Sequence, residues 1–506
     1  MLVDKADDVV PRPELVYRLI STVTNAPTVD GVLEVMNQVW ARMKEFGSVD
    51  DFVYVAAPLA RFIAKFCSPH YLNLFLTNVV SLLKQNFAAR ESSNGDNIAG
   101  RQLTKRLTAS VQEAIFAAVS SGRNFHEVLS HIGSIVPLMD FLDEAALIEV
   151  SRFILADVAS KPFQLNDPLS VRILLELSQI LYQSLSVFSP VDVIEKTNST
   201  IEWFLYRVDF GHNVEAHLNF LLSARSSFPA ASRLLSVIAR IALRLCASVF
   251  ARKVGNLDVV TRSLLAFAFV TIPSVSDPTE RARLYVLAAN VALTCCVSSF
   301  AHSCFDEFLK TLAVAEPSKA LFALCQHALG LLLVLPARPG VDPFEIVRTL
   351  IKTVIGIKWG DDEAPLFCLD AIIVASHMLR SEFVVRIANV DSNDVLFAGN
   401  EEYQARGLSV INQLLRMFVD LLTNYAKKGV VAAKTRVPTI ALRAIGALPD
   451  VLAPDTALVR RLAQLAELTT DASSVDDLRD TTGAHIEKVF AGNDLGTRYV
   501  EKYFSA

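Results

Sequence analysis

The sequence predicts an all-α protein, an α-solenoid of HEAT-like helical hairpins that is elongated and curved. Three observations support this fold class: amphipathic segments of helical period recur along the chain, sustained strand alternation is absent, and some helices carry two apolar stripes. The chain has 506 residues, beyond the roughly 250 to 300 residues at which a single compact core stops growing. A repeat array accommodates this length, and we expect residues 1–506 to form a single solenoid.

The segment from Leu169 to Phe188 shows the two stripes most plainly. A helix of this kind needs a hairpin partner on one side and the next hairpin on the other, as in stacked repeats. The first stripe comprises Val171, Leu174, Leu175, Leu181, Tyr182, Leu185 and Phe188, and the second comprises Ile173, Leu177 and Ile180.

Similar helical segments follow one another along the whole chain. Two helices per repeat of about 40 to 47 residues is the period of HEAT-like arrays. An N-cap residue followed by proline predicts four helix starts, at Asp167-Pro168, Ser189-Pro190, Asp277-Pro278 and Asp342-Pro343. The predicted segments are 28–46, 49–67, 69–89, 101–121, 142–159, 190–208, 230–253, 279–299, 341–358 and 403–427.

Three stretches break the helical pattern. Residues 90–101 are polar, contain two glycines and predict a mobile surface loop. Residues 390–402 predict an ordered loop, and residues 469–480 predict a further break. No linker long enough to separate independent domains is expected.

Composition limits the function classes. Apolar residues make up 52% and charged residues 20%, and the mean hydropathy is +0.38. The net charge of -5 provides no basic field, so nucleic acid is not an expected partner. Seven cysteines do not suit a disulfide framework and indicate a reducing compartment. The uncharged runs 284–305 and 320–337 approach the length of a membrane span, but polar interruptions favour buried solenoid helices.

The search for chemistry finds only near misses. His126 and His131 resemble a zincin pair, but their five-residue spacing turns them about 140° apart on a helix. Residues 95–102 have the glycine spacing of a phosphate loop without its lysine. Residues 295–304 hold Cys295, Cys296, His302 and Cys304 without the spacing of a zinc site, so we interpret the cysteines as small buried hydrophobes. We therefore predict no enzyme activity, no metal and no cofactor.

One cluster of charge is a candidate for partner binding. Arg233, Arg240 and Arg244 fall on one face of the predicted 230–253 helix. They fit a solvated face, and they also fit a contact with an acidic partner, because arginine is enriched at interface hot spots. The sequence leaves both interpretations open.

Four segments of the chain together carry a resemblance to a known family. The first is Val208-Asp-Phe-Gly-His-Asn-Val-Glu-Ala-His through Phe228. The second is Phe269-Val-Thr-Ile-Pro-Ser with Leu284-Tyr and Val291-Ala-Leu, the third is Leu331-Leu-Leu-Val-Leu-Pro with Pro339, and the fourth is Val390-Asp-Ser-Asn-Asp with Gly399. In this order they resemble the retriever scaffold family, the vacuolar protein sorting thirty-five-like paralogue of the retromer scaffold subunit. The looser resemblance runs from about residue 100 to the C-terminus and corresponds to the C-terminal half of the family.

The resemblance implies a non-catalytic scaffold of an endosomal cargo-recycling complex. Its C-terminal solenoid would hold a small sorting subunit with a phosphoesterase fold, and the complex would join coiled-coil and copper-metabolism-domain proteins. Such a protein would be cytoplasmic and peripheral on endosomes, reaching the membrane through partners only. The arrestin-fold subunit usually docks on the N-terminal half of the family, so the resemblance does not extend that partnership to this chain. A retromer scaffold or a generic HEAT-repeat adaptor is the alternative.

The fourth segment also supplies candidate contact residues. Asp391, Asn393 and Asp394 place turn-forming side chains between two strongly helical regions. They fit capping residues that hold a structural turn, and they equally fit contacts with the small phosphoesterase-fold subunit.

Overall fold

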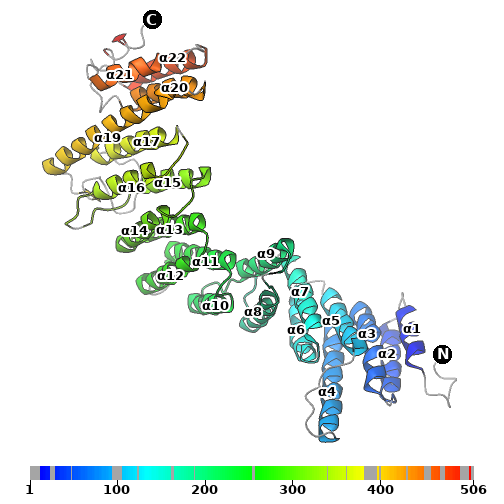
Figure 1. Ribbon diagram of the computed structural model, residues 1–506. Helices are drawn as coiled ribbons and strands as arrows, with labels where there is room; N and C mark the ends of the chain where they lie inside the picture. The colour runs from blue at the N-terminus through cyan, green and yellow to red at the C-terminus, as the bar shows by residue number, and fades with distance from the viewer. Residues whose placement is uncertain are drawn as a thin grey trace. The chain divides into compact units, whose positions relative to one another are not determined.

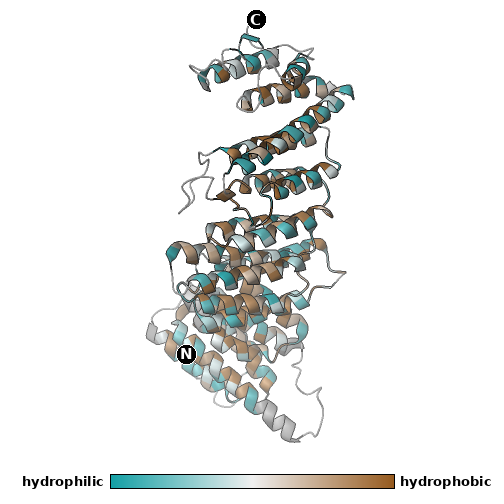
Figure 2. Ribbon diagram, turned by 90° about the vertical axis from the view of Figure 1, so that its left-hand side faces the viewer, coloured by the Kyte–Doolittle hydropathy of each residue, from teal (hydrophilic) through white to brown (hydrophobic). Residues whose placement is uncertain are grey.

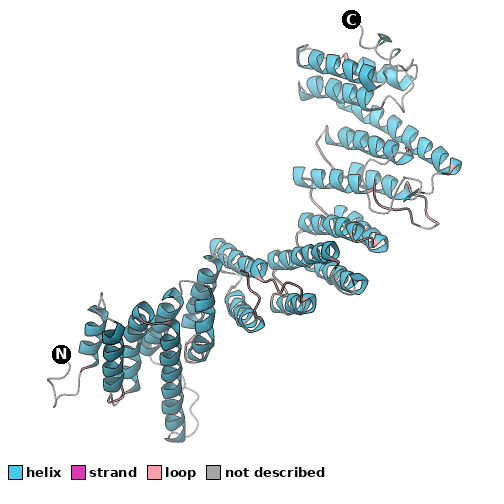
Figure 3. Ribbon diagram, turned by 180° about the vertical axis from the view of Figure 1, so that it is seen from behind, coloured by secondary structure: helices cyan, strands magenta, loops and turns pink. Residues whose placement is uncertain are grey.

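The protein is represented by a computed structural model. It describes residues 12–22, 29–46, 48–93, 105–121, 125–160, 164–186, 188–253, 257–338, 340–360, 362–380, 396–397, 400–428, 431–448, 457–467, 473–489, 498 and 501–502. Figure 3 shows that regular structure in these residues is helical, apart from one isolated bridge between Leu165 and Val208. The prediction of an all-α solenoid is confirmed.

The chain divides into two compact units, Met1–Ile238 and Ala239–Ala506, with the division inside helix α11 (Figure 1). Whether residues 1–506 act as one elongated, curved solenoid stays a prediction. The first unit contains α1 (Pro13–Thr22), α2 (Val29–Met43), α3 (Val49–Phe66), α4 (Pro69–Ser93), α5 (Lys105–Ser121), α6 (Phe125–Met139), α7 (Glu144–Ser160), α8 (Pro168–Gln183), α9 (Val191–Arg207), α10 (Val214–Ser227) and the start of α11 (Ser232–Arg252).

The second unit begins within α11 and continues through the C-terminal helices. It contains α12 (Leu257–Thr271), the 3-10 helix η2 (Ile272–Ser274), α13 (Pro278–Thr294), α14 (Ser298–Leu312), α15 (Lys319–Leu331), α16 (Glu345–Gly356), α17 (Glu363–Leu379), α19 (Glu401–Lys427), α20 (Val431–Ala447), α21 (Ala457–Ala466) and α22 (Ser473–Val489).

Each unit is a double layer of stacked hairpins. In the first unit α1, α3, α5, α7 and α9 pack in succession, while α4 packs on α6 and α8 on α10. In the second unit α13, α15, α17, α19 and α21 pack in succession, and α14 packs on α16. Many helices therefore contact both a hairpin partner and the next hairpin, which is why their sequences carry two apolar stripes. Figure 2 shows hydrophobic and hydrophilic residues side by side around the helices.

Two of the four predicted N-caps are confirmed. Asp167 accepts from the Ser170 amide at 2.9 Å, and Asp277 accepts from the Thr279 amide at 2.9 Å. The other two predictions are wrong, because α9 has Pro190 itself at the cap position and α16 starts only at Glu345.

Some predicted segments end earlier than their apolar pattern does. Helix α8 stops at Gln183, so Leu185 lies beyond it and Phe188 is 95% exposed rather than part of a buried stripe. The predicted helix 279–299 covers nearly all of α13, the turn after it and the first two residues of α14.

A Schellman motif separates α13 from α14. The Val297 amide donates to Ala292 O at 2.8 Å, and the Cys296 amide donates to Leu293 O at 3.0 Å. Cys296 occupies the left-handed position at φ 59°, where glycine is usual. Because a cysteine stands where glycine is usual, no residue type marks this helix end in the sequence.

The predicted loops overlap helices. Helix α4 runs to Ser93, α19 starts at Glu401 with Asn400 as its N-cap, and α22 starts at Ser473. The loop predictions for residues 90–93, 401–402 and 473–480 are therefore wrong. The rest of 90–101, most of 390–400 and all of 469–472 lie outside the described residues, including Asp391, Asn393 and Asp394.

The two apolar runs that approach the length of a membrane span are each divided. The turn after Thr294 interrupts residues 284–305, and α15 ends at Leu331 within residues 320–337. Among the described helices, α11 is the one that is long and apolar enough to cross a membrane by length and composition. In the protein, 61% of its most apolar stretch is buried. A buried helix of a stacked array passes the same test.

Candidate functional site

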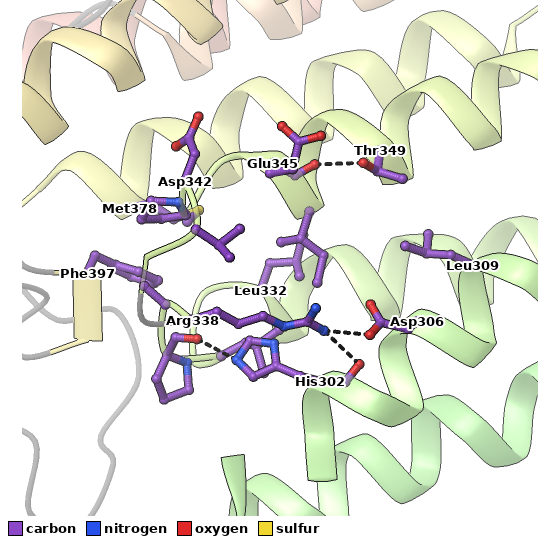
Figure 4. A pocket seen from close by; sticks show the side chains of 16 residues that line it. His302, Asp306, Leu309, Leu332, Arg338, Asp342, Glu345, Thr349, Met378 and Phe397 are labelled. Atoms are coloured by element: carbon purple, nitrogen blue, oxygen red, sulfur yellow. Dashed lines mark hydrogen bonds and ion pairs between the residues drawn. The ribbon is translucent and has the colours of Figure 1, made fainter. Parts of the chain in front are cut away.

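In the second unit, the chain directly after the third resemblance segment contacts Leu396. Directly after Pro336, the Ala337 amide donates to Leu396 O at 3.0 Å. Leu396 lies in the sequence between Asp394 and Gly399. Beside this contact, α14, the connection from α15 to α16 and the first turns of α16 enclose a pocket of about 140 Å³ (Figure 4).

The interior of this pocket is apolar. Its most buried lining side chains are Leu332, Leu335, Met378 and Phe397, each no more than 3% exposed. Leu309 adds apolar surface from α14, on the side opposite Phe397 in Figure 4. Such a lining, drawn from four parts of the chain, favours an apolar occupant.

Arg338 and His302 form one wall. The Arg338 Nη2 atom donates to Asp306 Oδ2 at 2.8 Å and to His302 O at 3.2 Å, and His302 Nε2 donates to Pro336 O at 2.9 Å (Figure 4). Burial, followed by the positive charge of Arg338, lowers the pKa of His302 below its usual value. A neutral His302 with its proton on Nε2 thus ties α14 to the connection before α16.

The opposite wall is acidic. The Asp342 carboxylate accepts from the Phe344 amide at 3.1 Å and forms an ion pair with Arg348. Arg348 also pairs with Glu345 at 3.1 Å, and the Glu345 side chain is 59% exposed. Figure 4 shows the Asp342 and Glu345 carboxylates across the pocket from Arg338.

Helix α19 packs closely against α17 and Phe344 behind the pocket. The Tyr403 hydroxyl donates to Met378 O at 2.9 Å, and its ring stacks on Phe344 with centroids 5.1 Å apart. Gly407, one turn further on, lies so close to α17 that an added Cβ would overlap Leu379 and come within 2.8 Å of Phe344. Glycine at this position lets α19 reach the pocket wall.

The described lining residues include one hydroxyl group, that of Thr349. It donates to Glu345 O at 2.9 Å.

The three predicted arginines take part in contacts within the protein. Arg233, in the first unit, pairs with Glu202 of α9 at 2.9 Å. Arg240, in the second unit, forms an ion pair with Glu280 of α13. The exposed Arg244 is also engaged in an interaction. Two of these residues thus link neighbouring helices, while a contact with an acidic partner stays a prediction.

Among the near-miss residues that the structure describes, His131, Cys295 and Cys304 lie in the core. His131 is 1% exposed and its Nδ1 lies 2.7 Å from Asn73 Oδ1, which satisfies it inside the core. Cys295 and Cys304 are buried, as predicted, but Cys296 is exposed. The sulfur of Cys295 lies 3.8 Å from that of Cys246, a neighbour that the sequence did not indicate. The described residues hold no group of three or more side chains arranged for a metal ion.

The pocket wall formed by Arg338 and His302 was not predicted from the sequence. The sequence connects His302 only with the nearby cysteines and Asp342 only with a helix start, and no motif in it includes Asp306 or Arg338. One feature of the sequence could have indicated this site. Charged residues, Arg338 and Asp342, stand between Pro336 and Pro343, directly after a long apolar run. The sequence does not reveal that α14 lies opposite.

The chain is similar to one family of known proteins. The family model described as the VPS35L C-terminal domain matches residues 1–476. The "VPS35 endosomal protein sorting factor-like" protein of Dictyostelium discoideum is 22% identical over 426 residues, which are 79% of this chain and 41% of that protein. The Mus musculus and Homo sapiens proteins named "VPS35 endosomal protein-sorting factor-like" are 23% and 22% identical, each over 78% of this chain and 41% of the relative.

The chain therefore spans about two fifths of the length of these curated relatives. Among solved structures, a circular tandem repeat protein aligns with 97% of this chain and 90% of its own at 12% identity, with a TM-score of 0.22. That score is too low to bear on the fold.

Proposed function

This chain belongs to the VPS35L C-terminal domain family, and from that premise we propose that it is the non-catalytic scaffold of an endosomal cargo-recycling complex of the retriever kind. In this proposal the chain holds a small phosphoesterase-fold sorting subunit. The complex joins coiled-coil and copper-metabolism-domain proteins, and the chain is cytoplasmic and reaches endosomes through these partners.

The match of the family model over residues 1–476 carries the proposal. It spans both compact units, and the similar proteins are themselves named endosomal sorting factors. Stacked hairpins support a scaffold, because each hairpin adds surface beside the last and a rigid partner can contact several of them. No observation favours a generic helical-repeat adaptor over this assignment.

Acidic residues of the 390–394 segment are the proposed contacts with the small subunit. Asp391, Asn393 and Asp394 belong to a segment that resembles the retriever scaffold family. Carboxylates at an interface pair with basic or amide groups of a partner and add specificity.

Reconstitution tests the scaffold function. The full 506-residue chain is mixed with the purified phosphoesterase-fold sorting subunit of the same organism, and complex formation is followed by light scattering after gel filtration and by calorimetry. We expect a one-to-one complex. Absence of a complex at protein concentrations of about 50 μM, where a specific interface is readily occupied, would refute the proposal.

A matched pair of double variants tests the contact residues. We expect Asp391→Ala/Asp394→Ala to weaken binding about tenfold without changing the melting temperature of the free chain. Asp477→Ala/Asp480→Ala, which removes the same charge from exposed positions of α22, serves as the control. A fall in melting temperature with unchanged affinity would instead assign Asp391 and Asp394 to a structural turn.

A further inference from the structure

We propose that the pocket between Arg338 and Asp342 is a docking site for a partner segment that inserts one apolar side chain and carries basic side chains beside it. The inference goes beyond the scaffold function. It concerns a site for a peptide segment and does not depend on the small phosphoesterase-fold subunit.

The size of the pocket selects a single side chain. Its volume of about 140 Å³ is close to the roughly 150 Å³ of an engineered apolar cavity that stays dry and binds benzene. Leucine, methionine or phenylalanine is of that size. The buried walls formed by Leu332 and Phe397 would cover such a side chain and remove its surface from water.

The mouth of the pocket is open to solvent. Val341, which precedes α16, lines the mouth and is 47% exposed. Thr349, within α16, also lines the pocket and is exposed. An exposed apolar residue at the entrance of an apolar pocket extends the surface that a partner can cover. The entering segment would therefore contact Val341 before its anchor reaches Leu332.

Arg338 supplies donors for the backbone of the inserted segment. A guanidinium group has five N–H donors. The hydrogen bonds of Arg338 to Asp306 and to His302 O both use its Nη2 atom. Figure 4 shows the other terminal nitrogen of Arg338 directed toward the pocket interior. A carbonyl oxygen next to the apolar anchor matches that donor.

The charges around the pocket favour a basic neighbour for the anchor. The pocket lining holds three carboxylates, Asp306, Asp342 and Glu345, and one guanidinium group, Arg338. A second guanidinium group, Arg348, lies outside the lining and pairs with Asp342. Both guanidinium groups are already paired with these carboxylates, whereas the Glu345 side chain is 59% exposed and its pair with Arg348 uses Oε2. A lysine or arginine beside the anchor would gain this carboxylate, and an acidic residue would be repelled by it.

Methyl NMR of the full chain tests the proposal with defined peptides. The chain contains six methionines, so ¹³C labelling of their methyl groups gives a simple spectrum in which Met378 is assigned from the variant Met378→Leu. The probes are acetyl-Gly-Lys-Leu-Lys-Gly-amide, its counterpart with glutamate in place of lysine, and its counterpart with glycine in place of leucine.

We expect the lysine–leucine peptide to shift the Met378 signal saturably, with a Kd on the order of 1 mM, as suits one buried anchor. The glutamate peptide should bind at least about threefold more weakly at low salt, and the peptide without leucine should give no saturable shift. Glu345→Gln should reduce the preference for lysine.

Two matched valine variants locate the binding. Val341→Trp places a large side chain at the mouth and should weaken binding about tenfold, while Val314→Trp, at a 66% exposed valine outside the pocket lining, should leave it unchanged. A Met378 signal that does not move, equal binding of the lysine and glutamate peptides, or undiminished binding by the folded Val341→Trp chain would each overturn the proposal.

Discussion

Replacing Gly407 with alanine should destabilise the second unit, although alanine is the better helix former. Gly407 is buried in α19. The added methyl group would overlap Leu379 and come within 2.8 Å of Phe344. Leu379 ends α17 and its side chain has some freedom to move, but the Phe344 ring is fully buried and stacked on Tyr403. The helix must therefore shift to relieve the contact with Phe344.

The magnitude follows from two opposing terms. Alanine gains about 1 kcal/mol over glycine in a helix interior, and overpacking of a filled core costs about 1 to 3 kcal/mol. Because two side chains are overlapped and one of them cannot withdraw, we place the cost in the upper part of that range. The expected net effect is a loss of about 1 to 2 kcal/mol in the free energy of unfolding.

Gly330→Ala is the matched control. Gly330 lies in α15 of the same unit, and an added Cβ there meets nothing within 4 Å, so this substitution should stabilise the chain by about 0.5 to 1 kcal/mol. Denaturant unfolding of the full chain measures both variants, and hydrogen exchange over residues 401–427 shows whether the effect is local. If Gly407→Ala stabilises the chain as much as Gly330→Ala does, the close approach of α19 to Phe344 is refuted.

Three further substitutions test local features of the fold. Cys296→Gly should raise the free energy of unfolding by about 1 kcal/mol, because the left-handed conformation of Cys296 is unfavourable for any residue with a Cβ; an unchanged denaturation midpoint would contradict the Schellman motif. Asp167→Ala should cost about 1 kcal/mol at neutral pH. Since hydrogen bonds from Ser170 lower the pKa of Asp167, that difference should shrink as the pH falls below 3.8, which parallel melts at neutral and acid pH will show. Burial lowers the pKa of His302 below 6.5, so the unfolded chain binds this proton more readily, and stability is full above pH 6.5 and declines as the pH falls below it. His302→Gln should flatten that decline in denaturation series, and an unaltered slope would show that His302 titrates normally.

The period of apolar residues was sufficient for the fold class and for the helices within the predicted segments. Other helices, among them α6, α10, α12 and α17, correspond to no predicted segment. The predicted segments 49–67, 190–208 and 403–427 differ from α3, α9 and α19 by one or two residues at an end. These boundaries are local: each depends on a cap or a break within one turn of the helix. One predicted helix failed where the local signal was missing, at Cys296, where a cysteine takes the usual place of glycine. Two predicted helix starts, at Ser189-Pro190 and Asp342-Pro343, failed although their signal is present.

The sequence by itself determined that the chain is helical, that its helices are buried on two sides, and which family it resembles, because these properties depend on spacing along the chain. The tertiary structure alone decided the site. Arg338 meets Asp306 across 32 residues of sequence, and Ala337 donates to Leu396, 59 residues further on. The same is true of Arg233 and Arg240, whose partners Glu202 and Glu280 lie on other helices. Which stripe of one helix faces which residue of another depends on how hairpins stack, and no periodicity within a single helix encodes that choice.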